Sequence, residues 1–178
     1  EKLKVSEIKS KLKDISGRLI PGGFGKRGTN GKIEAIKYAR KYQIPFLGIC
    51  YGMQMAIIEF ARNELKLKKA TSSEFDKKGL HIIGLINEWT RDGKKIKGTK
   101  KDLGGTMRLG SYDAKLKENS MIKRISKINI IKERHRHRYE VNVAFKEKFE
   151  KNGMYFSGLS PDGELPEIIE LKDHPWFI

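Results

Sequence analysis

The sequence predicts an α/β fold in which helices flank a mainly parallel sheet. Arg18–Ile20 predicts a short strand, and the apolar run Ile44–Ile49 has the length of a buried strand. The first leads into the glycine-rich turn Pro21–Gly25, and the second is followed by a helix-like run, Met53–Arg62. Strands that alternate with helices form parallel sheets, whose carboxyl ends carry the active site. We therefore expect both turns at one edge of the sheet.

The composition narrows the class of protein. A chain of 178 residues is long enough for one domain with a core, and it has no apolar run of the roughly 20 residues that span a bilayer. One cysteine cannot form an internal disulfide, which favours a reducing, cytoplasmic location. The net charge of +16 raises a nucleic-acid hypothesis, but the lysines are scattered with few aromatic residues between them. We expect neither nucleic acid nor membrane as a partner, although a basic face attracts anionic nucleotides.

The remaining elements follow from periodicity and turn signals. Those expected in the first half are a helix or connecting segment over Glu1–Asp14, a helix around Ile33–Ala39, a polar loop over Ala70–Phe75, a strand over Leu80–Ile86 and a turn at Arg91–Lys94. Those expected in the second half are a glycine-rich strand or loop over Asp102–Gly110, a short helix over Asn119–Ser126, a strand over Ile128–Ile131, a helix over Val143–Asn152, and strands Met154–Gly158 and Glu167–Leu171 around the turn Ser160–Gly163.

Cys50 lies between the second strand and its helix, flanked by Gly48 and Gly52. Gly-x-Cys-x-Gly in this context has the form of a nucleophile elbow, a sharp turn that lifts the side chain out of the sheet. Glycines on both sides let backbone segments approach closely, and the N-terminus of the helix favours a thiolate. The alternative is a structural cysteine in a packed strand–helix unit.

The stretch Arg134–Asn142 alternates arginine and histidine. On an extended segment, this alternation places Arg134, Arg136 and Arg138 on one face and both histidines on the other. Concentrated arginines suit a carboxylate or phosphate ligand, and the alternative is a salt-bridged edge strand. His-x-His without an acidic or cysteine partner nearby at ligand spacing does not predict a metal site.

These stretches resemble one family. The elbow Leu47–Gln54 is similar to that of class I glutamine amidotransferases, which have a flavodoxin-like fold. Four further segments resemble the glutaminase domain of CTP synthases: Pro21–Gly28, Leu103–Gly110, Arg134–Asn142 and the ending from Glu167 to Phe177. The resemblance implies glutamine hydrolysis through a Cys50 thioester, with the ammonia used by a separate domain that aminates UTP to CTP.

The resemblance also implies roles for individual residues. Cys50 would be the nucleophile, and the backbone N–H groups of Gly23 and Tyr51 would form the oxyanion hole. The residues expected to bind glutamine are Gly23, Tyr51, Gln54, Glu74 and Arg138. Phe24 and Arg27 lie in a loop running to Gly31, which we expect to act as a lid that binds GTP as an allosteric activator.

For the whole enzyme, the resemblance implies ATP and Mg as cofactors of a synthase domain in the same polypeptide, and a homotetramer. Residues 1–178 would then be the glutaminase domain alone, without the synthase domain. A further family strand would precede Glu1, and the catalytic His-Pro-Glu segment would follow Ile178. Cys50 therefore has no identified general base within this sequence.

Two positions depart from the family pattern. Tyr51 stands where CTP synthases usually have leucine, and Asn30 stands where a glutamate is common. Tyrosine at the first position resembles GMP synthetases, so another amidotransferase is an alternative. A basic non-enzymatic nucleotide-binding module is the other. Because the oxyanion donor is a backbone N–H, we expect the Tyr51 side chain to have little effect on the chemistry.

Overall fold

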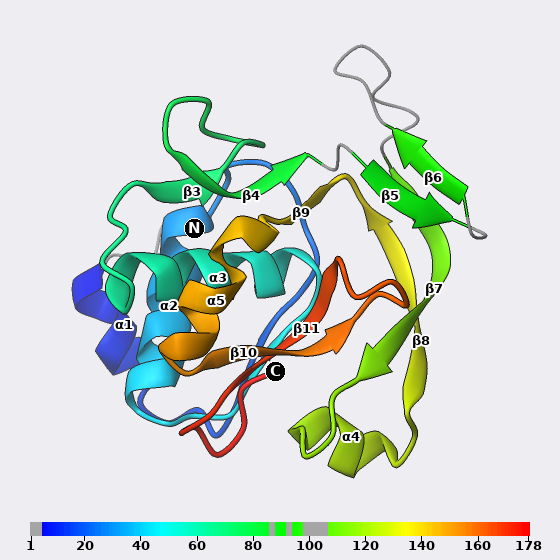
Figure 1. The fold of residues 1–178 in the computed structure, drawn as a ribbon. Coiled ribbons are helices and arrows are strands. Elements are labelled where there is room, and N and C mark those ends of the chain that lie inside the picture. Colours follow the sequence, from blue (N-terminus) through cyan, green and yellow to red (C-terminus); the bar gives the residue numbers. More distant parts are fainter. Residues whose placement is uncertain (1–4, 86–87, 92–93, 98–106) are drawn as a thin grey trace.

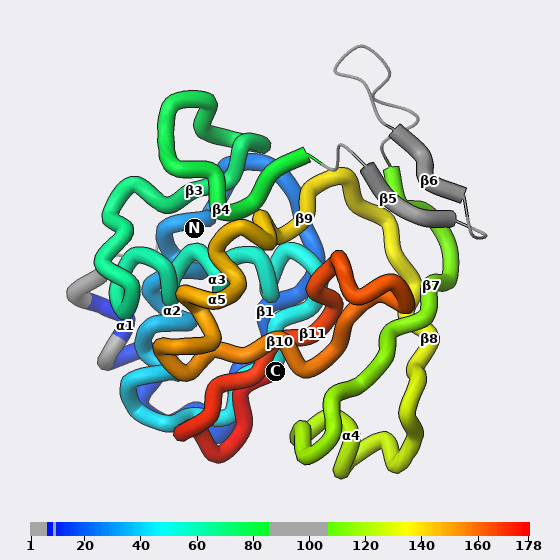
Figure 2. The backbone as a smooth tube through the Cα atoms, viewed as in Figure 1, coloured from blue at the N-terminus to red at the C-terminus, as the bar shows by residue number. Residues whose placement is uncertain are grey.

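The computed structural model describes residues 5–85, 88–91, 94–97 and 107–178. Figure 1 shows most helices grouped on one side and the long β7–β8 ribbon on the other, with α4 at its end. The helices are α1 (Val5–Leu12), α2 (Thr29–Lys41), α3 (Tyr51–Asn63), α4 (Met121–Ser126), the 3-10 turn η1 (Val143–Phe145) and α5 (Lys146–Lys151). The backbone path in Figure 2 brings the last residues back to the middle of the molecule.

Two parallel strand pairs carry the glycine-rich turns. β1 (Arg18–Ile20) pairs with β2 (Phe46–Gly48), with Ile20 opposite Gly48, and α2 makes the crossover between them. β3 (Ala70–Ser72) pairs in parallel with β4 (Leu80–Leu85). Because β1 and β2 are parallel, the turns that follow them lie at the same edge, as the sequence predicts.

The largest sheet is antiparallel. Its order is β11 (Pro166–Leu171), β10 (Met154–Leu159), β7 (Arg108–Leu116) and β8 (Ile130–His137). β9 (Tyr139–Val141) runs antiparallel to β4. A two-stranded pair, β5 (Glu88–Arg91) with β6 (Lys94–Lys97), completes the strands that the structure describes. The α/β class is confirmed, but the strand pairing is more antiparallel than predicted because tight hairpin turns, such as the one that joins β10 to β11, can only connect antiparallel strands.

Helix α3 forms the centre of the core. Met55, Ala56, Ile57 and Ile58 are fully buried, and Ala61 continues the same apolar surface. A helix that is apolar on nearly all sides must be enclosed by other elements, and α3 packs against α2, β2 and the β3–β4 pair. The first residue of this enclosed helix is Tyr51, so the elbow is joined directly to a buried helix at the centre of the core.

Two sequence expectations differ from the structure, and two others fall wholly or largely outside the described residues. Ala70–Ser72 is a fully buried strand instead of a loop, because its small polar residues pair with β4. The loop after Phe24 ends at Gly28, so Asn30 and Gly31 lie in the first turn of α2. The predicted turn at 92–93 and most of the glycine-rich stretch 102–110 lie outside the described residues.

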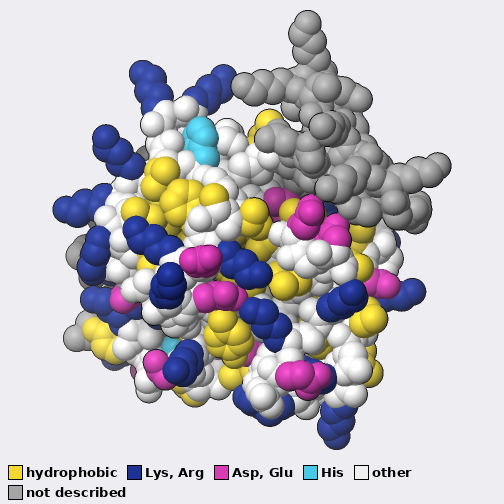
Figure 3. Space-filling model, in the orientation of Figure 1, with side chains coloured by type: hydrophobic (Ala, Val, Ile, Leu, Met, Phe, Trp, Pro, Cys, Tyr) yellow, Lys and Arg dark blue, Asp and Glu magenta, His cyan; other side chains and the backbone are white. Residues whose placement is uncertain are grey.

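The structure shows how the charged side chains are distributed over the surface. Figure 3 shows lysine and arginine side chains scattered over one face, with acidic side chains between them. In the part of the chain that the structure describes, no helix is both long and apolar enough to cross a membrane. The same residues contain no cluster of histidine, cysteine and carboxylate groups that could hold a metal ion.

Candidate active site

Cys50 lies between the end of β2 and the start of α3, as a nucleophile elbow requires. It occupies the N-cap position of the helix with φ 53° and ψ −101°. A non-glycine residue seldom has positive φ, and such strain persists only where the surrounding structure enforces it. The position predicted from the sequence is therefore confirmed, and the side chain is only partly exposed.

The flanking glycines are required by close packing. A Cβ atom at Gly52 would lie 2.1 Å from the carbonyl oxygen of Ile20 on β1. One at Gly48 would lie 2.9 Å from the Met53 nitrogen in α3. Such distances are too short for any side chain, so the sharp turn around Cys50 depends on both glycines.

The glycine-rich turn after β1 lies against the elbow. A Cβ atom at Gly22 would be 3.8 Å from the Cβ of Cys50, and one at Gly23 would be 3.6 Å from the Tyr51 ring. The Gly25 N–H donates a hydrogen bond to Glu74 Oε1 at 2.7 Å, and the Tyr51 hydroxyl donates to the Gly25 carbonyl. The structure thus brings Gly23, Tyr51 and Glu74 together around Cys50.

Gln54 and Arg138 lie on the other side of the helix start. Gln54 is 4% exposed and donates from Nε2 to the Tyr139 carbonyl at 2.8 Å, which ties α3 to the junction between β8 and β9. Arg138 occupies that junction and is half-buried. Among the residues that the structure describes, Arg138 has no ion-pair partner, so a cation is available there for a carboxylate.

Phe24 and Arg27 both lie on the turn before α2. Phe24 is 87% exposed, and Arg27 is exposed as well. The Arg27 carbonyl accepts a hydrogen bond from Lys32 Nζ at 3.3 Å. An aromatic ring exposed to this extent buries no apolar area in the protein, so it is free to stack on a ligand.

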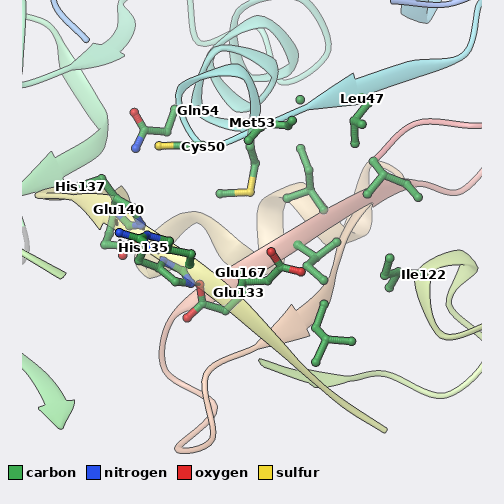
Figure 4. A pocket seen from close by; sticks show the side chains of 17 residues that line it. Leu47, Cys50, Met53, Gln54, Ile122, Glu133, His135, His137, Glu140 and Glu167 are labelled. Atoms are coloured by element: carbon green, nitrogen blue, oxygen red, sulfur yellow. Dashed lines mark hydrogen bonds and ion pairs between the residues drawn. The ribbon is translucent and has the colours of Figure 1, made fainter. Parts of the chain in front are cut away.

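A cavity of about 240 Å³ opens beside Cys50. Figure 4 shows Cys50, Met53 and Gln54 on one side of it, and His135, His137, Glu140 and Glu167 on the opposite side. Its remaining wall is largely apolar and includes Leu47, Ile49 and Ile178. Of the predicted glutamine-binding residues, Gln54 lines this cavity, whereas Gly23, Tyr51, Glu74 and Arg138 do not.

A buried charge cluster forms the far wall of the cavity. Arg108 on β7 is 2% exposed and donates to Glu140 at 2.9 Å and to Glu167 at 2.6 and 3.2 Å. His135 and His137 hydrogen-bond to each other at 2.8 Å and face the same carboxylates. The predicted alternation holds along β8, where the histidines face inward and Arg134 and Arg136 are exposed, but Arg138 lies beyond the strand and is half-buried, so the three arginines do not share one exposed face.

One guanidinium in this cluster faces two carboxylates. Burial raises the pKa of Glu140 to about 7, in spite of the attraction of Arg108. Burial and the Arg108 charge lower the pKa of His135 to about 3 and also lower that of His137. The cluster therefore holds neutral histidines and one guanidinium between two buried carboxyl groups, of which Glu140 titrates near neutral pH.

The pKa of the Cys50 thiol is raised. Burial is the main cause, and the negative charges of Glu140 and Glu74 act in the same direction, whereas a hydrogen bond with the Tyr51 backbone opposes them. The backbone hydrogen bond at the first residue of α3 favours the thiolate, but burial outweighs it, so the expected preference for the thiolate is not met. A thiol in this environment needs a base to become a nucleophile.

The sequence analysis assigned no role to the charge cluster. Its members come from β7, β8, β9 and β11, which are far apart in the sequence. The one available signal was the inward face of His135 and His137, which the alternation predicted. Arg108 and Glu167 gave no signal of their own, because a buried charge is visible only when its partners are known.

Comparisons with known proteins agree with this geometry. A family model described as glutamine amidotransferase class-I matches residues 2–178. A CTP synthase from Pelagibacter ubique is 83% identical over 178 residues, which are 100% of this chain and 33% of that protein. A CTP synthase from Rhodospirillum rubrum is 54% identical over 168 residues, 94% of this chain and 31% of that protein.

A solved structure of a glutaminase domain is also similar to this chain. The glutaminase domain of CTPS from Trypanosoma brucei, with bound acivicin, is 35% identical and superposes with a TM-score of 0.84. The match covers 97% of this chain and 64% of that one. The chain spans about a third of the length of the curated relatives that it matches.

Proposed function

Because this chain belongs to the class I glutamine amidotransferase family, we propose that it is the glutaminase domain of a CTP synthase and releases ammonia from glutamine. One observation carries the proposal. Cys50 is held in a strained elbow beside the turn that bears Gly23, with the Glu74 carboxylate bound to that turn. Arg138, which pairs with no carboxylate among the described residues, lies next to Tyr139, whose carbonyl accepts a hydrogen bond from Gln54. A nucleophile, backbone donors and two opposite charges are the groups that an α-amino acid amide requires.

The charges account for substrate binding. The α-carboxylate of glutamine is bound by Arg138, because this half-buried guanidinium pairs with no carboxylate in the described part of the chain and would gain a charge-assisted hydrogen bond. The α-ammonium group is bound by Glu74, which already accepts one hydrogen bond from Gly25. Gln54 holds the backbone at Tyr139, next to Arg138, by a hydrogen bond to the Tyr139 carbonyl.

The reaction proceeds in two steps. The Cys50 thiolate attacks the side-chain amide carbon, and the resulting oxyanion accepts hydrogen bonds from the Gly23 and Tyr51 N–H groups. Protonation of the amide nitrogen lets ammonia leave, and a γ-glutamyl thioester remains on Cys50. Water then attacks the thioester, which yields glutamate and returns the proton to the thiol.

We infer that the base reaches Cys50 from the cavity side. Phe177 pairs in parallel with Phe46, and the Gly48 N–H donates to the Ile178 carbonyl at 2.8 Å. At Ile178 the chain therefore runs in the same direction as β2, toward Cys50. This direction supports the expectation that the family's His-Pro-Glu segment follows Ile178 and supplies the base.

The activity of the whole enzyme is part of the proposal. Ammonia would pass to a synthase domain of the same polypeptide, which uses ATP and Mg to convert UTP to CTP. GTP would act as an activator near Phe24 and Arg27, and the enzyme would be a cytoplasmic homotetramer. The high identity to CTP synthases favours this function over a GMP synthetase, in spite of Tyr51.

Substitution of Cys50 tests the proposal. In the full-length protein, Cys50→Ala should abolish glutamine-dependent CTP formation and leave ammonia-dependent formation intact, because only ammonia release needs the thiol. Both rates are measured with UTP, ATP and Mg present. Retained glutamine use by the alanine variant would exclude Cys50 as the nucleophile, and failure of the parent to form CTP from ammonia would exclude the synthase assignment.

A further inference from the structure

The Tyr51 side chain contacts the turn that carries the second oxyanion donor. Tyr51 is the first residue of α3 and is 2% exposed. Its ring lies against Gly23, where a Cβ atom would be 3.6 Å from Cδ1 and 3.9 Å from Cγ. Its hydroxyl donates a hydrogen bond to the Gly25 carbonyl. The Tyr51 side chain therefore packs against the turn at Gly23 and forms a hydrogen bond with it at the Gly25 carbonyl.

The turn is fixed on both sides of Gly25. The Gly25 N–H, in one peptide group, donates to Glu74 Oε1 at 2.7 Å. The Gly25 carbonyl, in the next peptide group, accepts from Tyr51. Gly25 itself has φ +73°, and glycine moves easily between positive and negative φ. Without these two hydrogen bonds the turn would have many backbone conformations. The two hydrogen bonds hold the peptide groups on either side of Gly25 in a single conformation.

We propose that the Tyr51 hydroxyl is a positioning group for the oxyanion hole, an inference that rests on the proposed glutaminase function. The backbone N–H of Tyr51 is one of the two donors, and Gly23 provides the other. Because the Tyr51 side chain braces the turn that bears Gly23, it fixes the position of one donor relative to the other. An oxyanion hole stabilises the transition state only when both donors are in place before charge develops.

The effect depends on which side chain stands at position 51. Leucine, which the resemblance indicates in most CTP synthases, has no hydroxyl and cannot hold the Gly25 carbonyl. The expectation that only the backbone of residue 51 matters is revised accordingly. The Lys32 ammonium lies 5.6 Å from the centre of the Tyr51 ring and adds a further contact between α2 and the elbow.

The Tyr51 hydroxyl remains a hydrogen-bond donor near neutral pH. Burial raises the pKa of Tyr51 to about 12, and the nearby Glu74 carboxylate acts in the same direction. The phenol is therefore protonated near neutral pH, and its proton is available for the Gly25 carbonyl.

Tyr51→Phe in the full-length protein removes the hydroxyl and keeps the ring. We expect kcat for glutamine hydrolysis to fall about 2- to 10-fold, the equivalent of one hydrogen bond. The glutamine KM should change less than about twofold, since the oxyanion exists only in the transition state. Tyr51→Leu should reduce kcat at least as far. Ammonia-dependent CTP formation reports on the integrity of each variant.

Tyr42→Phe is the matched control. Tyr42 is 55% exposed at the end of α2, where its ring stacks on Tyr38, so loss of its hydroxyl should leave every rate unchanged. Unchanged kcat in Tyr51→Phe, or a higher KM with unchanged kcat, would overturn the inference while the glutaminase function stands. If the parent protein does not hydrolyse glutamine, the proposed function fails and the inference fails with it.

Discussion

Glu140→Gln offers a direct test of the charge cluster beside Cys50. Glu140 is 6% exposed and shares the guanidinium of Arg108 with Glu167. Glutamine has nearly the same volume and can still accept the hydrogen bond from Arg108, but it carries no charge. The remaining pair of Arg108 and Glu167 is then electrically neutral, so the substitution removes the one carboxylate without its own counter-charge.

The magnitude follows from the pKa of Glu140. That pKa is about 7 in the folded protein, against the usual 4.5. A raised folded-state pKa means that stability is fully present below pH 4.5 and is lost as the pH rises through 7. Between pH 5.5 and pH 8 the parent should lose about 2 kcal/mol of unfolding free energy through this group, at about 1.4 kcal/mol per pKa unit. The glutamine variant should not show this loss.

Urea unfolding of the domain, followed by circular dichroism, measures the effect. The difference in unfolding free energy between Glu140→Gln and the parent should rise by about 2 kcal/mol from pH 5.5 to pH 8. Comparing the two proteins cancels the histidines, whose lowered pKa values make the parent less stable in acid. Glu147→Gln, at an exposed pair with Lys151, is the control and should show no such rise.

Cys50 gives a second readout of the same substitution. The Glu140 carboxylate helps to raise the pKa of the thiol, so its removal should lower that pKa. Alkylation of Cys50 by iodoacetamide at pH 7.5 should therefore be faster in Glu140→Gln than in the parent. The prediction that Glu140 titrates near neutral pH would be refuted by two results together. These are a stability difference between variant and parent that does not depend on pH, and an unchanged rate of Cys50 alkylation.

Two further predictions concern binding. Arg138→Ala should raise the glutamine KM about 30- to 150-fold, because one charge-assisted contact is worth on the order of 2–3 kcal/mol; an unchanged KM in a folded variant would transfer the role to another arginine. Asn30→Glu should strengthen GTP-stimulated, glutamine-dependent CTP synthesis several-fold, as a contact of about 1 kcal/mol allows. Equal GTP stimulation of parent and variant would show that asparagine at position 30 does not weaken the response. Because Asn30 lies in the first turn of α2, the stability of the helix is measured in both proteins as a control.

The elbow could be predicted from the sequence because its signal is local. Gly48, Cys50 and Gly52 lie within five residues, between an apolar strand and an apolar helix. The contact at Gly48 is made with the start of α3, whereas the contact at Gly52 is made with Ile20 on β1, which is distant in the sequence. The sequence pattern therefore predicted the position of the nucleophile, but one of the two close contacts behind it is visible only in the fold.

The rest of the site depends on contacts between distant segments. Glu74 reaches Gly25 across 49 residues, and Arg108 reaches Glu167 across 59. β3 was missed for a similar reason, since Ala70–Ser72 has no apolar pattern and exists as a strand only because β4 pairs with it. Resemblance to a family can supply such partners for the known motifs, but it assigned no role to the Tyr51 hydroxyl or the cluster around Arg108.

The backbone at Cys50 also has a consequence for how the domain changes through mutation. With φ 53° and ψ −101°, the nucleophile occupies a conformation that costs a non-glycine residue on the order of 1–3 kcal/mol. Glycine tolerates positive φ, so Cys50→Gly would relieve most of this strain while it removes the thiol. Selection for folding alone would thus favour an inactive domain. A cysteine is retained at this position only where selection for its catalytic activity opposes that change.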